Sequence, residues 1–504
     1  MGMLKPAAVF GSHMVLQRGK PVNIFGTGIN GRTVSVSFCG KTSSAEVRGH
    51  KWNVVLPPQD KYAADLTAVI SDGTETVIFS DIAVGEVWLA GGQSNMELEL
   101  QNSKDGKEEL KNCGETNVRF YYTKKNAFFD DYFYADEENG GWQLPSESGS
   151  GCWSAVGYYF GKKLSEDLNC TVGIIGCNWG GTSASAWISR KYLVSDPDTK
   201  TYVDELDEAM NSTTPEQYLA DREEYFSWEE KWQAGINEYY SLHTDDANWE
   251  DAQKYAGGPC RYPEPLGFRS PFRAAGLYET MLQRVCPYTL AGFIYYQGES
   301  DDHKPDTYYK LLKMLIEQWR SDWNDDTLPF LFVQLPMHRY KDDEDKKNWC
   351  IIREAQMRVH LTTANTGLAV ILDKGEFNNI HPVDKKDVGH RLEMQALCHV
   401  YGRLFPEDAY GPIYKYSYAA DGGMYIIFDY GDGMYSDGEL TGFEAAGADG
   451  VYFPAKARII KDTVFIRSDN VKDPRSARYQ WVNYGKVTLF GRNGIPAAPF
   501  RSKR

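Results

Sequence analysis

The sequence predicts an α/β protein, in which a three-layer α/β/α domain with a parallel sheet carries accessory β-sandwich-like regions at the N- and C-termini. Two observations support this fold class. Five compact apolar runs, with helical periodicity between them, are typical of parallel strands buried between helices. Near both ends of the chain, short runs alternate apolar and polar residues between glycines, as in antiparallel β regions.

Residues 1–85 form the predicted N-terminal β region. Runs at 21–25 and 34–38 alternate in polarity, and a glycine lies soon after each of them. This spacing indicates short antiparallel strands. The run at 81–85 leads directly into the next apolar segment. We therefore expect this region to join the next domain without a flexible linker.

Residues 86–402 form the predicted central domain. Its clearest helix follows Pro305, where Tyr308, Leu311, Leu315 and Trp319 recur at helical spacing. In sheets covered by helices on both faces, ligands bind beyond the carboxyl ends of the strands. The five strands are expected at 86–90, 171–176, 291–296, 329–334 and 368–373.

Two segments depart from this alternation. Residues 195–265 are acidic, aromatic and helical in period, which predicts an inserted helical segment. This insertion is either a lid over a substrate site or a solvated scaffold, and the sequence favours neither. Residues 403–504 return to short glycine-rich strands and form the predicted C-terminal β region.

Composition limits the partners of the chain. A formal net charge of −16 disfavours nucleic acids and anionic membrane surfaces. Nine cysteines without CxxC spacing argue against a disulfide framework or a zinc site, so we expect no metal and no cofactor. No apolar run approaches the length of a membrane helix. Location remains open between the cytoplasm and, if a leader has been removed, the periplasm or the exterior, and the oligomeric state is not predicted.

Ser94 is the candidate nucleophile. It follows the apolar run 88–92, which ends in Gly91 and Gly92, so a sharp turn places it at the start of a helix. Free backbone N–H groups at such a position can face an oxyanion. Ser94 and Glu97 also match a capping box, an ordinary helix start. The two interpretations are compatible if the hydroxyl faces a cleft.

Polar and glycine residues follow several of the predicted strands, as a hydrolase site requires. His381 is the candidate base for Ser94, and the alternative interpretation is a loop histidine that holds a backbone carbonyl group. Oxyanion donors are expected from the Ser94 amide, the amide of Gly180 or Gly181, and the Gln297 side chain. The residues at the strand ends are Gln93 and Ser94; Trp179, Gly180 and Gly181; Gln297 and Glu299; and Asn378, Asn379 and His381.

These motifs resemble the sialate O-acetylesterase family, a branch of the SGNH (GDSL-like) hydrolases. The resemblance implies an SGNH-type catalytic domain and serine-dependent removal of O-acetyl groups from a sugar, commonly sialic acid, without a metal. It assigns the nucleophile to Ser94, the base to His381, and the oxyanion donors to Ser94, the Gly180–Gly181 turn and Gln297. The matching segments are 14–17 (MVLQ), 85–89 (GEVWL), 92–96 (GQSNM), 179–182 (WGGT), 296–300 (YQGES), 380–382 (IHP) and 388–392 (VGHRL).

One departure from the family pattern concerns the acid that supports the histidine. The wider superfamily often carries aspartate three residues before the histidine, and this family commonly carries one two residues before it. Asn378 and Asn379 occupy these positions here. Asparagine does not stabilise an imidazolium ion as a carboxylate does. Candidate orienting groups are Asn378, through its loop, Asp373 and Glu299, with Glu376 as a further acid, and we predict a Ser–His dyad with backbone assistance.

The predicted function is a serine esterase that releases acetate from carbohydrate through an acetyl-serine intermediate, with O-acetylated sialic acid as the leading substrate. The close alternative is acetylxylan or another plant glycan. A non-catalytic carbohydrate-binding protein on a degenerate hydrolase scaffold is the alternative from another class. Arginine suits a sugar carboxylate, although structural pairing with nearby acids is the favoured explanation for any single arginine. The candidate substrate-binding residues are Gln93, Trp179, Arg190, Arg269, Arg273 and His338.

Overall fold

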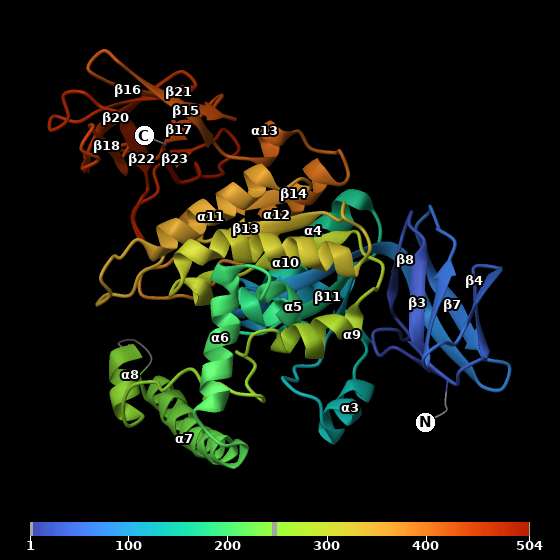
Figure 1. The fold of residues 1–504 in the computed structure, drawn as a ribbon. Coiled ribbons are helices and arrows are strands. Elements are labelled where there is room, and N and C mark those ends of the chain that lie inside the picture. Colours follow the sequence, from blue (N-terminus) through green and yellow to red (C-terminus); the bar gives the residue numbers. More distant parts are fainter. Residues whose placement is uncertain (1–3, 244–248, 503–504) are drawn as a thin grey trace.

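The computed structural model describes residues 4–243 and 249–502. A central α/β body carries the N-terminal strands on one side and the C-terminal strands on another (Figure 1). The predicted α/β fold class, with a sheet of parallel strands and further β regions near both ends, is confirmed. No helix in the described ranges is both long and apolar enough to cross a membrane.

The N-terminal strands form two sheets around a shared apolar core. In β4 and β6 every second residue is buried, which is the alternation expected when one face of a sheet is covered. The long strand β8 belongs to this region at its start and to the central sheet at its end. The strands are β1 Lys5–Pro6, β2 Val15–Gln17, β3 Val22–Thr27, β4 Thr33–Phe38, β5 Lys41–Glu46, β6 Lys51–Leu56, β7 Ala63–Ser71 and β8 Thr76–Gly92.

The central sheet has the strand order β10-β9-β11-β8-β12-β13-β14, and only β10 runs antiparallel to its neighbour. Its middle strands are buried along their whole length, which explains their nearly continuous apolar sequences. The strands that follow β8 are β9 Val118–Tyr122, β10 Trp142–Gln143, β11 Val172–Asn178, β12 Gly292–Tyr296, β13 Phe330–Gln334 and β14 Thr366–Val370.

Two strand predictions need correction. Strand β9 was not predicted, and its five residues VRFYY include Arg119, a side chain that donates to the carboxylate of Asp81. The fifth strand was predicted at 368–373 but spans Thr366–Val370, because the chain turns into a short 3-10 helix at Leu372–Lys374. A paired charge, Arg119, concealed β9, whereas the apolar pattern ran past the end of β14 because Ile371 and Leu372 stay buried beyond the strand.

Helices cover both faces of the central sheet. Trp88 of β8 contacts Phe160 of α4, whereas Gly91, on the opposite face of the same strand, lies against Trp319 of α10. Helix α12 packs on α4 and α11 packs on α10, which completes the three layers. These helices are α4 Ala155–Leu168, α10 Tyr308–Asp322, α11 Asn348–Thr362 and α12 Lys386–His399. Shorter helices are α2 Gly106–Asn112, α3 Asp131–Glu138, α9 Gln283–Val285 and α13 Pro406–Ala409.

The predicted insertion at 195–265 is helical where it is described, and residues 244–248 lie outside the described residues. Helices α7 and α8 project from the central body, whereas α6 lies nearer to it (Figure 1). Trp232, Ile236 and Ala252 form a small core between α7 and α8. The helices of this part of the chain are α5 Arg190–Leu193, α6 Pro197–Asn211, α7 Pro215–Leu242 and α8 Trp249–Tyr255.

The C-terminal strands have an apolar core of their own that includes Ile426, Val464 and Tyr479. The divisions at 85/86 and 402/403 stay predictions, and the first of them falls inside β8. The strands are β15 Ile413–Ala420, β16 Gly423–Asp429, β17 Tyr435–Ser436, β18 Phe443–Ala446, β19 Tyr452–Pro454, β20 Lys456–Ile460, β21 Thr463–Arg467, β22 Ser476–Tyr479, β23 Leu489–Phe490 and β24 Phe500–Arg501.

Candidate active site

The chain turns sharply where β8 ends and the short helix α1, Ser94–Glu97, begins. Gly92 has φ of 137°, and a Cβ on it would lie 2.1 Å from the carbonyl oxygen of Tyr296 in the neighbouring strand. Only glycine permits both this backbone conformation and this approach. The turn therefore holds Ser94 at the carboxyl end of the sheet.

Ser94 and His381 are brought together at this edge. The Oγ atom of Ser94 lies 2.8 Å from Nε2 of His381, which comes from the loop after β14. Asn379 shapes that loop, because its Oδ1 accepts from the backbone N–H of His381 at 3.0 Å and its Nδ2 donates to Glu376 at 2.8 Å. The serine hydroxyl can donate to a neutral ring nitrogen at this distance.

The surroundings of His381 favour its neutral form. Partial burial lowers the pKa of the imidazole below 6.5, and the positive charges of Lys385 and His338 lower it further. The carboxylate of Glu97 acts in the opposite direction. A neutral imidazole is the form that can take a proton from Ser94.

None of the three predicted orienting groups contacts the His381 ring. Asp373 makes a two-point ion pair with Arg391 at 2.5 and 2.8 Å. Glu299 accepts from Asn95, and the side chain of Asn378 accepts from the backbone of Lys341. Within residues 4–243 and 249–502 no group accepts a hydrogen bond from Nδ1 of His381. The expected backbone assistance to the ring is likewise not observed in this part of the chain.

The predicted oxyanion donors differ in what they already bind. Gly180 lies against Ser94, but its N–H donates to the carboxylate of Glu97 at 2.6 Å. The Gln297 amide donates to Asp301 at 2.6 Å and to the carbonyl of Thr182 at 3.3 Å, so both its protons are engaged. No protein acceptor for the Ser94 backbone N–H occurs in the described part of the chain. The Ser94 amide is therefore the donor best placed to receive an oxyanion.

The capping-box interpretation needs correction. Gln93, not Ser94, occupies the N-cap position of α1, and its side chain makes no capping hydrogen bond. Glu97 reaches Gly180 and Lys125 instead of the helix start. Gln93 is held by Ser300, which accepts from Nε2 of Gln93 and donates its backbone N–H to Oε1, each at 3.1 Å. The Ser94 hydroxyl is thus left to face the pocket.

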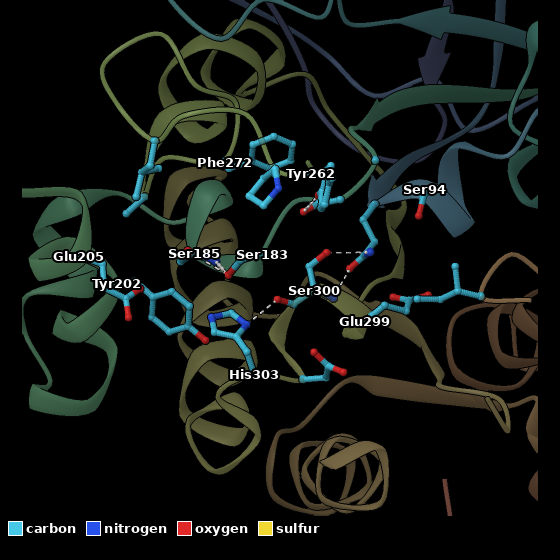
Figure 2. Close-up of a pocket in the computed structure, with 18 of the residues that line it drawn as sticks. Ser94, Ser183, Ser185, Tyr202, Glu205, Tyr262, Phe272, Glu299, Ser300 and His303 are labelled. Atoms are coloured by element: carbon cyan, nitrogen blue, oxygen red, sulfur yellow. Dashed lines mark hydrogen bonds between the residues drawn. The ribbon is translucent and has the colours of Figure 1, made fainter. Parts of the chain in front are cut away.

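A cavity of about 810 Å³ opens at Ser94 and His381. The predicted insertion forms part of its wall through Tyr202, Glu205 and Tyr262. Figure 2 shows Tyr202 and Glu205 on the side of the pocket away from Ser94. The insertion therefore contacts the pocket, and its role as a lid or flank stays a prediction.

The charged groups in the wall were not predicted from the sequence as a set. Acidic side chains come from Glu205, Glu299 and Asp302, and the imidazole of His303 lies beside them. No arginine or lysine lines this cavity in the described ranges. Asp302 and His303 come two and three residues after the YQGES motif, so their proximity in sequence was a usable signal, whereas nothing in the sequence places Glu205 there.

Most of the other predicted substrate-binding residues lie elsewhere. Arg273 pairs with Glu279 at 3.1 Å, Arg190 pairs with Asp207 at 2.5 Å, and the Arg269 guanidinium lies 4.5 Å from the ring centroid of Phe128. His338 lines a neighbouring cavity of about 340 Å³, and Trp179 packs against the core. Of this predicted set, only Gln93 lines the cavity at Ser94.

Comparisons with known proteins agree with this architecture. Residues 269–394 match the family model described as carbohydrate esterase, sialic acid-specific acetylesterase. Sialate O-acetylesterase from Mus musculus is 27% identical over 433 residues, which cover 79% of this chain and 73% of the mouse protein. The human sialate O-acetylesterase is 25% identical over 440 residues, with 79% and 71% covered.

A solved structure is similar over nearly the whole chain. The crystal structure of a carbohydrate acetylesterase from Xanthomonas citri superposes with a TM-score of 0.76 at 27% identity, covering 99% of each chain. Together these similarities confirm that the chain resembles the sialate O-acetylesterase family and that it is an esterase.

Proposed function

We propose that this esterase removes O-acetyl groups from carbohydrate, with Ser94 as the nucleophile and His381 as the general base. The 2.8 Å contact between Ser94 Oγ and His381 Nε2 carries the proposal. A serine hydroxyl becomes an effective nucleophile when a base within hydrogen-bond reach accepts its proton. The lowered pKa of His381 keeps that base neutral near pH 7.

The reaction proceeds in two balanced steps. Ser94 Oγ attacks the acetyl carbonyl carbon while His381 takes its proton, and the carbonyl oxygen becomes an oxyanion at the Ser94 N–H. The proton then passes from His381 to the departing sugar oxygen, leaving acetyl-serine and a free sugar hydroxyl. In the second step His381 takes a proton from water, whose oxygen attacks the acetyl carbonyl carbon; the bond to Ser94 Oγ then breaks, His381 returns the proton to Oγ, and acetate leaves.

Gly180 supplies a second oxyanion donor if Glu97 moves away from it. One oxygen of the Glu97 carboxylate accepts a hydrogen bond from the Gly180 N–H, and the other oxygen pairs with Lys125. A substrate oxyanion that takes the place of this carboxylate receives a second N–H beside the Ser94 amide. Such donors typically contribute on the order of a hundredfold or more in rate.

The pH dependence of the reaction follows from the His381 environment. Since only the neutral ring acts as base, kcat/KM rises as the pH increases through the His381 pKa. Burial and Lys385 lower this pKa below 6.5, so the midpoint of the acid limb is expected below pH 6.5. Acetate release from an acetylated saccharide, measured between pH 4 and 8 at saturating and limiting substrate, tests this. A midpoint above pH 6.5 contradicts it.

The pocket charge favours a neutral saccharide over sialic acid as the substrate class. Sialic acid carries a carboxylate, and a site for it requires a cation or several N–H donors. Here the acidic side chains of the lining are Glu205, Asp302 and the buried Glu299, and burial raises the pKa of the last two. The Lys304 ammonium beside Glu205 is already paired with that acid. Acetylated xylan and related neutral glycans carry no charge that these acids would repel.

A substrate panel tests this preference. We expect kcat/KM on acetylated xylo-oligosaccharides to exceed that on O-acetylated sialosides by about tenfold or more, since close like charges cost at least this factor. The Asp302→Asn variant should narrow the gap by improving the sialoside reaction. The preference is wrong if sialosides are the better substrates and Asp302→Asn leaves the ratio unchanged. Loss of activity on both substrate classes would point instead to a structural role of Asp302.

A further inference from the structure

Three polar side chains directly beneath the Ser94–His381 pair form a buried network. Asn95 and Lys385 are each 1% exposed, and Glu299 is 4% exposed. Charged side chains are almost never buried to this extent unless they are paired. The network comes from three separate elements: Asn95 from α1, Glu299 from the turn after β12, and Lys385 from the start of α12.

Asn95 connects these elements through all the polar atoms of its side chain. Its Nδ2 donates to Oε1 of Glu299 at 2.6 Å and to the carbonyl oxygen of Ile380 at 2.9 Å. Its Oδ1 accepts from Nζ of Lys385 at 2.6 Å. Because Asn95 follows Ser94 and Ile380 precedes His381, a single amide joins the turn of the nucleophile to the loop of the base.

The charges of the network are bridged by this amide and are not in direct contact. Burial lowers the pKa of Lys385, whereas the carboxylates of Glu299, Glu376 and Asp384 act to raise it. Burial likewise raises the pKa of Glu299, whose Oε2 is buried and has no hydrogen-bond partner among the described residues. The Lys385 ammonium also lies 5.1 Å from the ring centroid of Tyr296. Burying charges that are not in direct contact costs stability. The presence of this network beside the catalytic pair therefore points to a functional role.

His381 is the titratable group next to this network. The charged or titratable groups that act on the pKa of its ring are Lys385 at the N-cap of α12, His338 from the segment after β13, and Glu97 from α1. Lys385 contributes more than His338 to the lowered pKa of the ring, and Glu97 opposes both. Because none of the predicted acids contacts the ring, burial and these three groups set its pKa.

We propose that Asn95, Lys385 and Glu299 are positioning residues that fasten the Ser94 turn to the His381 loop and place a cation beside the imidazole. The inference rests on the proposed roles of Ser94 and His381. A typical triad uses a carboxylate to orient and stabilise its histidine. Here the loop is held from the backbone side through Ile380, and the nearby cation keeps the ring in its neutral, proton-accepting form.

The test compares Lys385→Met with the double variant Lys385→Met/Glu299→Gln, in the full-length protein. The single variant leaves the Glu299 carboxylate buried without its cation, so it is expected to melt at a lower temperature. The double variant removes both charges and should recover thermal stability. Lys386→Met is the matched control, because Lys386 is the next residue in the chain and its side chain is exposed.

The decisive measurement is the NMR titration of the His381 ring, assigned by difference from His381→Ala. In the double variant the His381 pKa should rise by about 0.5 to 1 pH unit, because a nearby positive charge has been removed. The acid limb of kcat/KM should move upward by the same amount. Lys386→Met should leave both quantities unchanged. Asn95→Ala should lower kcat much more than it changes KM, since it loosens the two catalytic segments.

Two outcomes would overturn the proposal: an unchanged His381 pKa in the double variant, or full kcat in Asn95→Ala. The ring titration reports on the cation whether or not any ester is hydrolysed. Failure of the proposed function has a separate signature, which is retained esterase activity in Ser94→Ala. The two failures are therefore distinguishable.

Discussion

Replacing Ser94 with alanine is expected to lower kcat for acetate release by on the order of 10⁶-fold, the loss typical when a serine hydrolase loses its nucleophile. Among the residues that the structure describes, Ser94 Oγ makes one hydrogen bond, to His381 Nε2 at 2.8 Å. The substitution removes no buried apolar volume, so the melting temperature should stay within the range of surface substitutions. An acetate assay combined with thermal melting measures both quantities.

A matched serine and a covalent probe control this experiment. Ser212→Ala changes an exposed serine at the end of α6 and should leave kcat unaltered. An organophosphonate probe should add a single group to the wild-type protein, on Ser94, and none to Ser94→Ala. Turnover that persists in Ser94→Ala, or a probe adduct on another serine, would contradict the mechanism. Absence of any turnover in the wild type would favour a carbohydrate-binding protein on a degenerate scaffold.

Strands and strand ends were the most predictable part of the molecule. Runs such as 291–296 and 329–334 are apolar because both faces of the sheet are covered, and this signal does not depend on distant contacts. The polar residues after these strands fall at one edge by topology alone. The sequence therefore predicted that Ser94 and His381 would meet, although 287 positions separate them.

The pocket wall and the charge pairs were not predictable in the same way. Tyr202 and Glu205 enter the cavity because α6 packs beside the central body, a tertiary contact without local sequence signature. Asp373 was one of the predicted orienting groups for His381. Arg391 of α12 instead donates a hydrogen bond to each of its carboxylate oxygens. Which of many acids a given arginine pairs with is decided by packing, and the sequence alone does not specify it.

His381→Ala is expected to cost about as much in kcat as Ser94→Ala, on the order of 10⁶-fold, because nucleophile and base act as a unit. For the same reason the double variant Ser94→Ala/His381→Ala should be hardly slower than either single variant. His381 lies on a loop in the wall of the cavity, solvent-accessible although surrounded by protein, so folding should survive the change. Added imidazole should restore part of the activity of His381→Ala, but none in Ser94→Ala, since it can replace a missing base and not a missing nucleophile.

The contrast with Asn378 decides whether an asparagine stands in for the missing acid. The Asn378 side chain accepts from the Lys341 backbone and does not reach the ring, so its removal should change turnover far less than His381→Ala. Asn378→Gly is the suitable variant, because Asn378 has φ of 61° and glycine tolerates this conformation without strain. Equal losses in Asn378→Gly and His381→Ala would show that the loop supports the imidazole directly. A small loss leaves the Ser94–His381 pair working without a carboxylate, as the unpaired Nδ1 in the described residues requires.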